Sequence, residues 1–224
     1  MARKFDPLLG EILSLRGPRG GMIFFRKDPV LGVDLESAIN NAVFPGLQGG
    51  PHHHTIGGLA VCLKHAQSSE FKVYQNKVIA NCRALAIQLV ELGYKLVSGG
   101  SDNHLVLVDL RPLGIKREWR KFLTWPQSLS TRTQYLSALV SGGIRIGSPA
   151  MTTRGFTERE FAAVANFIHE GVKITFDAKP LVPGPKLREF LKFVTTFDFP
   201  LIDRVSDLRS SVKALTTQFP IPGL

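Results

Sequence analysis

The apolar run from His104 to Leu110 constrains the fold more than any other part of the sequence. It reads His-Leu-Val-Leu-Val-Asp-Leu, with Gly99-Gly100 before it and Pro112 after it. A short, continuous apolar run between turn signals is typical of a central strand of a sheet. We therefore predict a sheet in which residues 104–110 form a central strand.

Other segments predict further strands and helices. Turn signals and short apolar runs indicate strands at 21–27, 94–98 and 144–146, the first of them buried. Apolar residues at helical spacing predict helices at about 35–43, 52–67, 186–194 and 201–219. The 52–67 helix is apolar almost all round, which predicts that it is buried. In the last helix the predicted buried stripe is Val205, Leu208, Val212 and Leu215.

Two more helices are marked by signals at their ends. Gly93 stands where the C-terminal cap of one is expected, and Thr157 with Glu160 forms a capping-box sequence at the start of the other. The first helix would bury Val78, Cys82, Leu85 and Leu89. The second would bury Phe161, Val164, Ile168 and Val172. This mixture of helices and strands predicts an α/β or α+β chain.

Composition excludes several classes of protein. Of the 224 residues, 44% are hydrophobic and 21% are charged, as in an ordinary globular protein. The net charge of +10 would suit a nucleic-acid binder, but the basic residues are dispersed and no binding motif accompanies them, so we expect no nucleic-acid partner. No apolar run reaches the roughly 18 residues of a membrane span. Cys62 and Cys82 cannot frame a disulfide scaffold, and we expect both to be buried thiols.

Gly49-Gly50-Pro51 lies just ahead of the predicted 52–67 helix. Glycines at that place let backbone N–H groups approach an anion, and the helix N-terminus adds a favourable partial charge. A plain tight turn explains the same residues. Three histidines follow, His52 to His54, but consecutive histidines at a helix start cannot all face one ion, and no cysteine or carboxylate cluster completes a site. We predict no metal.

Arg145 is a charged residue within the predicted strand 144–146. Its guanidinium would either reach solvent at a sheet edge or form a bidentate pair with a carboxylate, and the residues alone do not decide between the two. Ser101-Asp102-Asn103-His104 contains the residue types of a hydrolytic pair, but no nucleophile motif surrounds it. We interpret this segment as a strand entry with Asx-type hydrogen bonds.

Four segments, taken in order, resemble serine hydroxymethyltransferase, also called glycine hydroxymethyltransferase. They are Leu15–Lys27, Ala42–His54, Leu96–Gly114 and Gly142–Arg154. The likeness extends over roughly 14–114 and 137–224, and around 26–42 and 170–179 the sequence is most similar to the plastid type of plants.

The resemblance implies an α/β fold of pyridoxal-phosphate fold type I, the aspartate-aminotransferase-like architecture. Residues 1–65 would be a remnant of the large cofactor-binding domain and the start of a linking helix, and 66–224 the α+β C-terminal small domain. The implied reaction is the reversible conversion of serine and tetrahydrofolate to glycine and methylene-tetrahydrofolate, in one-carbon metabolism. The implied cofactor is pyridoxal 5′-phosphate, and the implied assembly is a dimer.

The resemblance also assigns roles to individual residues. Gly49 and Gly50 match the loop that binds the cofactor phosphate of the neighbouring subunit, and Arg19 matches an arginine close to the cofactor. Arg145 matches the arginine that holds the amino-acid carboxylate, a task for which a bidentate guanidinium is suited. His53 departs from the family's usual asparagine.

Larger departures concern catalysis. The family's N-terminal half has no counterpart here, and Leu13 stands in place of the Schiff-base lysine, so no residue is expected to be catalytic. Residues 115–136 abandon the family pattern. Codons can be chosen for 117–136 that spell the family's own sequence when read in a shifted frame, including the stretch that contacts folate. We infer a frameshift in the gene or in its reading.

We therefore expect a C-terminal fragment of a serine hydroxymethyltransferase that is inactive alone and does not retain the cofactor by itself. The alternative is a non-catalytic partner or pseudoenzyme that docks on full-length subunits. Partners would be glycine or serine and folate, together with further copies of the chain or full-length subunits, and no membrane. The resemblance suggests a plastid, although the first residues show no transit peptide; the cytoplasm and the mitochondrion remain open.

Overall fold

A computed structural model describes residues 15–29, 31–113, 142–182, 189, 192–194, 196 and 198–221, and the backbone alone of 8–11 and 131–133. The chain divides into two compact units, Met1–Val73 and Tyr74–Leu224. Each unit is described by itself. The predicted domains 1–65 and 66–224 stay a prediction, because contacts within the chain do not identify a family domain.

The first unit contains a hairpin and the first helices. Strand β1 (Leu8–Glu11) pairs antiparallel with β2 (Gly21–Phe24), which confirms a strand within 21–27. Helices α1 (Leu35–Asn41), η2 (Ala42–Leu47) and α2 (His53–Ala66) follow. Asp34 caps α1 by accepting the N–H of Ser37, and the hydrogen bonds from Ser37 lower the pKa of the Asp34 carboxyl.

The predicted burial of this unit is wrong. Phe24 at the end of β2 is more than half exposed, and Cys62 is the one buried residue of α2. A two-stranded sheet covers little apolar surface, so β2 has few neighbours to bury it. In the described part of the chain, the loop that contains Pro18 lies against α2, and the Pro18 ring is close to Gly58. Helical periodicity shows which residues can be buried, but it cannot supply the surface that buries them.

The second unit is built on a sheet with the strand order β3-β4-β6-β5. The strands are β3 (Lys95–Leu96), β4 (Leu105–Asp109), β5 (Thr131–Thr133) and β6 (Gly143–Gly147), and each neighbouring pair is antiparallel. β4 lies between β3 and β6, as predicted for a central strand. The predicted strand 94–98 is shorter, because a 3-10 turn, η3 (Val97–Gly99), replaces its second half.

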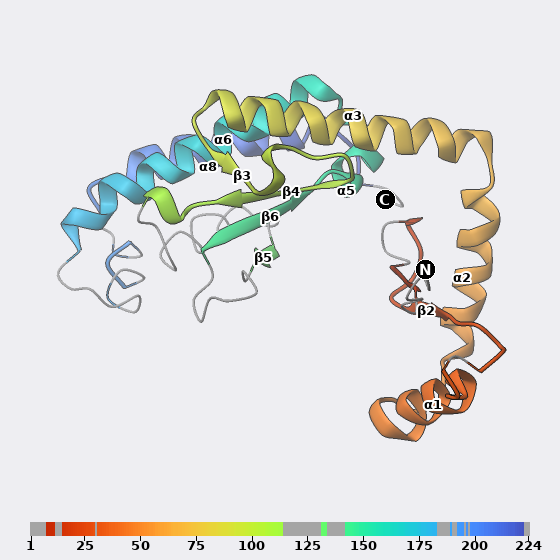
Figure 1. Cartoon of the computed structure of the whole chain (residues 1–224). Helices are drawn as coiled ribbons and strands as arrows, with labels where there is room; N and C mark the ends of the chain where they lie inside the picture. The colour runs from red at the N-terminus through yellow and green to blue at the C-terminus, as the bar shows by residue number, and fades with distance from the viewer. Residues whose placement is uncertain are drawn as a thin grey trace. The chain divides into compact units, whose positions relative to one another are not determined.

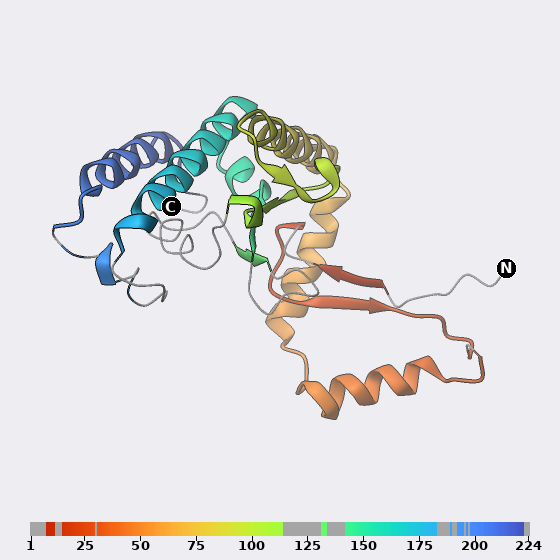
Figure 2. The same ribbon diagram turned by 60° about the vertical axis from the view of Figure 1, so that its left-hand side comes forward.

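Long helices cover one face of this sheet (Figures 1 and 2). They are α3 (Ser69–Glu91) and α6 (Glu158–Ala178), with α8 (Ile202–Thr216) alongside α6. The core lies between them and the sheet, where the α3 and α6 stripes meet strand residues of β4 and β6. Both predicted stripes are buried in full, which confirms the two helices and their inward faces. The strand residues in this core are Val106, Val108, Ile144 and Ile146.

The predicted helix ends are confirmed as well. Gly93 has a φ of +87°, in the left-handed region that favours glycine, and the Tyr94 N–H donates to the Leu89 carbonyl at 3.0 Å. Glu160 accepts the backbone N–H of Thr157 at 2.8 Å in a complete capping box. The hydrogen bonds from the Thr157 hydroxyl and from the Thr157 backbone N–H lower the pKa of the Glu160 carboxyl.

Helix α8 is joined to α6 by charged groups. Arg204 donates to Glu170 at 2.7 Å and to Asp177 at 2.6 Å, so one guanidinium bridges two carboxylates of α6. The stripe of α8 is half-buried rather than buried: Val205 and Leu208 pack against a smaller cluster around Phe199. The predicted helix 186–194 lies largely outside the described residues.

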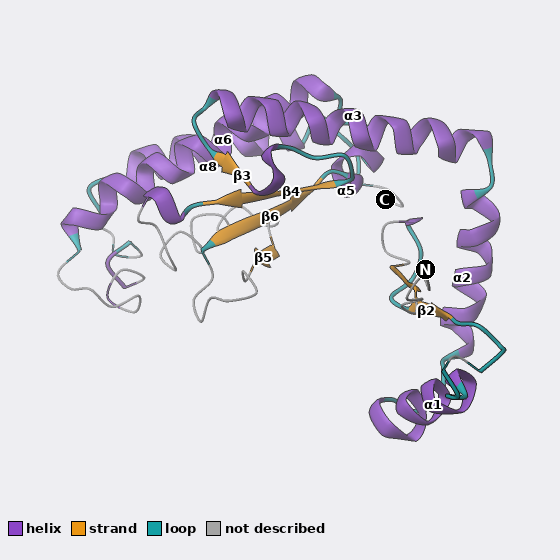
Figure 3. Cartoon of the chain, viewed as in Figure 1, coloured by secondary structure: helices purple, strands orange, loops and turns teal. Residues whose placement is uncertain are grey.

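Figure 3 shows the mixture of helices and strands that the sequence predicts. Cys62 and Cys82 are buried free thiols, as expected. Within the described part of the chain, no helix is both long and apolar enough to cross a membrane.

Truncating Leu89 will test the core of the second unit. Leu89 is fully buried in α3, whereas Ile87 on the outer face of the same helix is 60% exposed. We expect Leu89→Ala to lower the free energy of unfolding by about 2–5 kcal/mol and Ile87→Ala to lower it by less than about 1 kcal/mol. Urea denaturation measures both. Equal losses would contradict the assigned faces of α3.

Stability will depend on pH through His169. The buried Tyr94 hydroxyl and His169 Nδ1 lie 3.0 Å apart, and burial, followed by the nearby Lys173, lowers the pKa of His169. The unfolded state therefore binds more protons than the folded state as pH falls below about 6.5, so stability falls with pH there. We expect a lower urea midpoint at pH 5.5 than at pH 7.5, and a smaller difference in His169→Gln. The exposed His53→Gln is the control and should retain the wild-type difference.

Candidate functional site

One cavity of about 750 Å³ in the first unit is lined by Arg19, Gly49 and Gly50, the three residues that the family resemblance assigns to the cofactor. Arg19 comes from the loop before β2, and the glycines come from the loop between η2 and α2. The other lining residues are Gly20, Gly21, Asn40, Val43, Phe44, Gln48, Pro51, His52, Thr55, Ile56 and Leu59. The volume is within the range of small-molecule sites.

The glycine loop leaves its backbone accessible on the cavity side. A Cβ added at Gly49 or at Gly50 would meet no atom within 4 Å, and neither residue has a left-handed φ. Gln48 anchors the loop, because its N–H donates to the Val43 carbonyl at 2.7 Å. Glycine is therefore not needed for the turn itself, which favours the anion interpretation over the plain turn, since small residues let a ligand approach the backbone.

Helix α2 begins at the same cavity. Its N-terminal cap, His52, makes no side-chain capping hydrogen bond, and His52 and Thr55 both line the cavity. The first N–H groups of a helix have no partner within the helix, and they carry the positive end of its dipole. Together with the guanidinium of Arg19, this arrangement favours a compact anion such as a phosphate.

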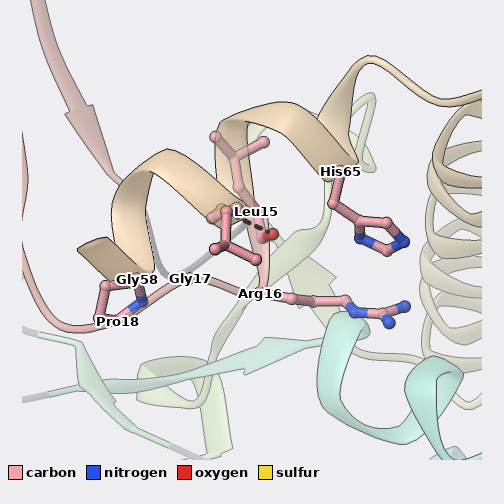
Figure 4. A pocket seen from close by; sticks show the side chains of 8 residues that line it. Leu15, Arg16, Gly17, Pro18, Gly58 and His65 are labelled. Atoms are coloured by element: carbon pink, nitrogen blue, oxygen red, sulfur yellow. Dashed lines mark hydrogen bonds between the residues drawn. The ribbon is translucent and has the colours of Figure 1, made fainter. Parts of the chain in front are cut away.

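A second, smaller cavity of about 400 Å³ lies in the same unit (Figure 4). Leu15, Arg16, Gly17 and Pro18 line it from one side, and α2 residues that include Cys62 and His65 line it from the other. The Cys62 thiol donates to the Leu15 carbonyl at 3.2 Å, and this bond ties the loop to α2. Leu13, the residue predicted to replace the lysine, lies outside the described residues.

Arg145 lies in β6, opposite Leu107 of β4 and Thr131 of β5. Its neighbours Ile144 and Ile146 are buried against the helices, so the alternation of a strand places the exposed Arg145 on the opposite face of the sheet. Of the two alternatives that the residues left open, a position at a sheet edge is wrong, because β6 lies between two strands and Arg145 is exposed on the face of the sheet. Arg145 belongs to the second unit, and the cavity belongs to the first.

The remaining sequence candidates have structural roles or none. Asn103 Oδ1 accepts the N–H of Leu105 at 3.0 Å, which confirms the Asx-type strand entry at 101–104. The His52 and His54 rings lie 5.4 Å apart. Among the described residues, no three histidine, cysteine or carboxylate side chains are grouped to hold a metal ion. The frameshift inferred for 115–136 lies outside the described residues, apart from the backbone of β5.

Sequence reasoning missed Asn40 and Gln48, two polar residues that also line the larger cavity. Gln48 could have been found, because it directly precedes the glycine pair. Asn40 had no local signal, since it reaches the cavity from α1 through the fold.

Alanine at the glycine loop should be tolerated by the fold. Gly49→Ala and Gly50→Ala add a methyl group into open space, so we expect a melting temperature equal to that of the wild type or slightly higher. Gly142 is the matched control, because a Cβ there would lie 2.6 Å from Cγ of Arg111, whose guanidinium is held by Asp109 at 2.7 Å. Gly142→Ala should lower the melting temperature. A large loss at Gly49 would contradict the open loop.

Comparison with known proteins gives one consistent result. The family model for serine hydroxymethyltransferase matches residues 12–168. Serine hydroxymethyltransferase 3, chloroplastic, from Arabidopsis thaliana is 66% identical over 94% of this chain and 41% of its own length. The cytosolic serine hydroxymethyltransferases of Neurospora crassa and Oryctolagus cuniculus are each 47% identical, over 93% and 94% of this chain and 46% of their own lengths. The chain thus spans less than half the length of these relatives, and it belongs to the serine hydroxymethyltransferase family.

Proposed function

We propose that the chain serves the reversible conversion of serine and tetrahydrofolate to glycine and methylene-tetrahydrofolate, as part of a serine hydroxymethyltransferase. Its relatives carry that name, but the chain spans only 41–46% of their lengths. The observation that carries the proposal is the cavity shared by Arg19, Gly49 and Gly50. The family resemblance assigns each of these residues to the cofactor, and the fold brings all three to one cavity.

The lining of this cavity fits the phosphate end of pyridoxal 5′-phosphate. In a dimer, the backbone around Gly49 and Gly50 would donate to the phosphate of the cofactor that the neighbouring subunit holds, from a loop that no side chain blocks, and Arg19 in the same cavity would pair with that phosphate. When bound, the cofactor supplies an electron sink for bond cleavage at the amino-acid α-carbon. Arg145 would hold the amino-acid carboxylate through a bidentate contact. Tetrahydrofolate would be the co-substrate.

Alone, the chain should not catalyse the reaction, since its sequence has Leu13 where the family has the cofactor lysine. The alternative function is that of a non-catalytic partner that docks on full-length subunits. Apolar side chains on the first unit favour it: Leu31 is 97% exposed, Leu47 82% and Val61 70%. Exposed apolar groups of this size are typical of a surface that another protein covers. The chloroplastic relative supports a location in a plastid, which is part of this proposal.

Inorganic phosphate binding will test the cavity on the chain as it stands. We expect a single site seen by calorimetry, weakened about tenfold or more by Arg19→Gln because a charge-assisted contact is lost. Lys27→Gln removes the same charge from an exposed residue outside the cavity lining, and it should leave the affinity unchanged. Equal affinities for the two variants would contradict the phosphate site.

Borohydride trapping in the presence of pyridoxal 5′-phosphate will separate the two functions. A chain without the cofactor lysine should give no specific lysine adduct, and full-length subunits expressed with it should co-purify if it is their partner. A single modified lysine at stoichiometric yield would contradict the expected inactivity. If full-length subunits do not co-purify with the chain, the partner function is contradicted, and the chain is a fragment of the enzyme.

A further inference from the structure

Helix α3 makes a row of hydrogen bonds to the segment that follows Arg145. The row starts from Tyr74, Val78 and Asn81, which lie four and three residues apart and therefore share one face of the helix. It reaches the segment 148–156, which contains the short helix α5 (Pro149–Thr153). We call these contacts the α3 clamp.

Each contact of the α3 clamp has good geometry. The Tyr74 hydroxyl lies 3.1 Å from the Pro149 carbonyl oxygen, to which it donates. The Ser148 hydroxyl donates to the Val78 carbonyl at 2.8 Å. The Asn81 amide donates to Thr152 Oγ1 and to the Phe156 carbonyl, both at 2.9 Å. The clamp thus holds the segment at its beginning, middle and end.

Asn81 is the centre of the clamp. Its side chain is 1% exposed, and both amide hydrogens are used. Thr152 links Asn81 to Ser148, because its hydroxyl also donates to the Ser148 carbonyl at 2.8 Å. A buried amide contributes little net stability compared with an apolar side chain, and it is strongly unfavourable when a partner is lost. The buried Asn81 amide therefore serves to fix one geometry of the segment 148–156.

The clamp acts on the strand that carries Arg145. Ser148 is three residues beyond Arg145, and its N–H donates to the His104 carbonyl at 2.9 Å, at the end of the β4–β6 pairing. The strand end is therefore held both by the sheet and by α3. Bidentate recognition of a carboxylate requires a guanidinium whose backbone is fixed to a fraction of an ångström.

We infer that Asn81 is a positioning residue for carboxylate binding by Arg145, acting through Thr152 and Ser148 on the end of β6. The inference rests on the proposed function, in which Arg145 receives the amino-acid carboxylate. Asn81 touches neither the substrate nor the cofactor in this role. It fixes the strand from which Arg145 extends.

The test uses the full chain, with glycine as the carboxylate probe and the Arg145 Nε–H resonance as the reporter. Arg145→Lys assigns the resonance. Asn81→Ala removes the clamp centre, and Thr152→Val removes one hydroxyl without changing the side-chain shape. The matched control is Thr175→Val, which removes another buried hydroxyl, in α6, that donates to the Gly171 carbonyl at 2.8 Å. Hydrogen exchange of the β6 amides is recorded for every variant.

We expect glycine to shift the wild-type Arg145 signal in a saturable way. Asn81→Ala and Thr152→Val should each weaken glycine binding about fivefold or more and speed exchange in β6. Thr175→Val should change neither glycine binding nor the exchange rate in β6. Thr152→Ser keeps the hydroxyl and should resemble the wild type in both measurements. If Asn81→Ala fails to fold, the comparison of Thr152→Val with Thr175→Val decides alone.

The remaining outcomes separate the two proposals. Equal glycine affinity in the wild type, Thr152→Val and Thr175→Val overturns the positioning role and leaves carboxylate binding by Arg145 intact. No response of Arg145 to glycine in the wild type overturns the proposed carboxylate site itself, and the positioning role falls with it.

Discussion

The second unit depends on the burial of one sheet face under α3 and α6. Apolar residues of β4 and β6 alternate toward these helices, and the stripe of α6 and most of the stripe of α3 meet them in a single cluster. Removing this area from water is the main favourable contribution to folding, at roughly 25 cal/mol per Å². Every other feature of the unit, including the exposed Arg145 and the polar contacts of α3, depends on the orientation that this packing sets.

Helices and strands that carry a complete apolar repeat of their own could be predicted from the sequence. α3, α6, β4 and β6 each combine an apolar repeat with a turn or cap signal, such as Gly93 or Thr157, and the structure confirms all four. β1 could not be predicted, because the four residues Leu8–Glu11 form a strand only by pairing with β2. The burial of α2 was predicted wrongly, since burial depends on distant surfaces that no local pattern encodes.

The candidate site likewise contains residues that the sequence marks and residues that only the fold reveals. Gly49, Gly50 and Arg19 were found because the family motifs mark them, and the cavity they share is a property of the fold. Asn81 had no signal in the sequence, because an asparagine in a helix is ordinarily a surface residue. Its importance becomes visible only with its partners Thr152 and Phe156, more than 70 residues away in the chain.

The exposed apolar residues of the first unit also bear on the fate of the chain in a cell. Leu31, Leu47 and Val61 present the kind of surface that chaperones and proteases recognise. If the chain docks on full-length subunits, as in the alternative proposal, that surface is protected only while it is covered. The steady-state level of the chain should then follow the supply of those subunits rather than its own rate of synthesis, as in the quality control of orphan subunits.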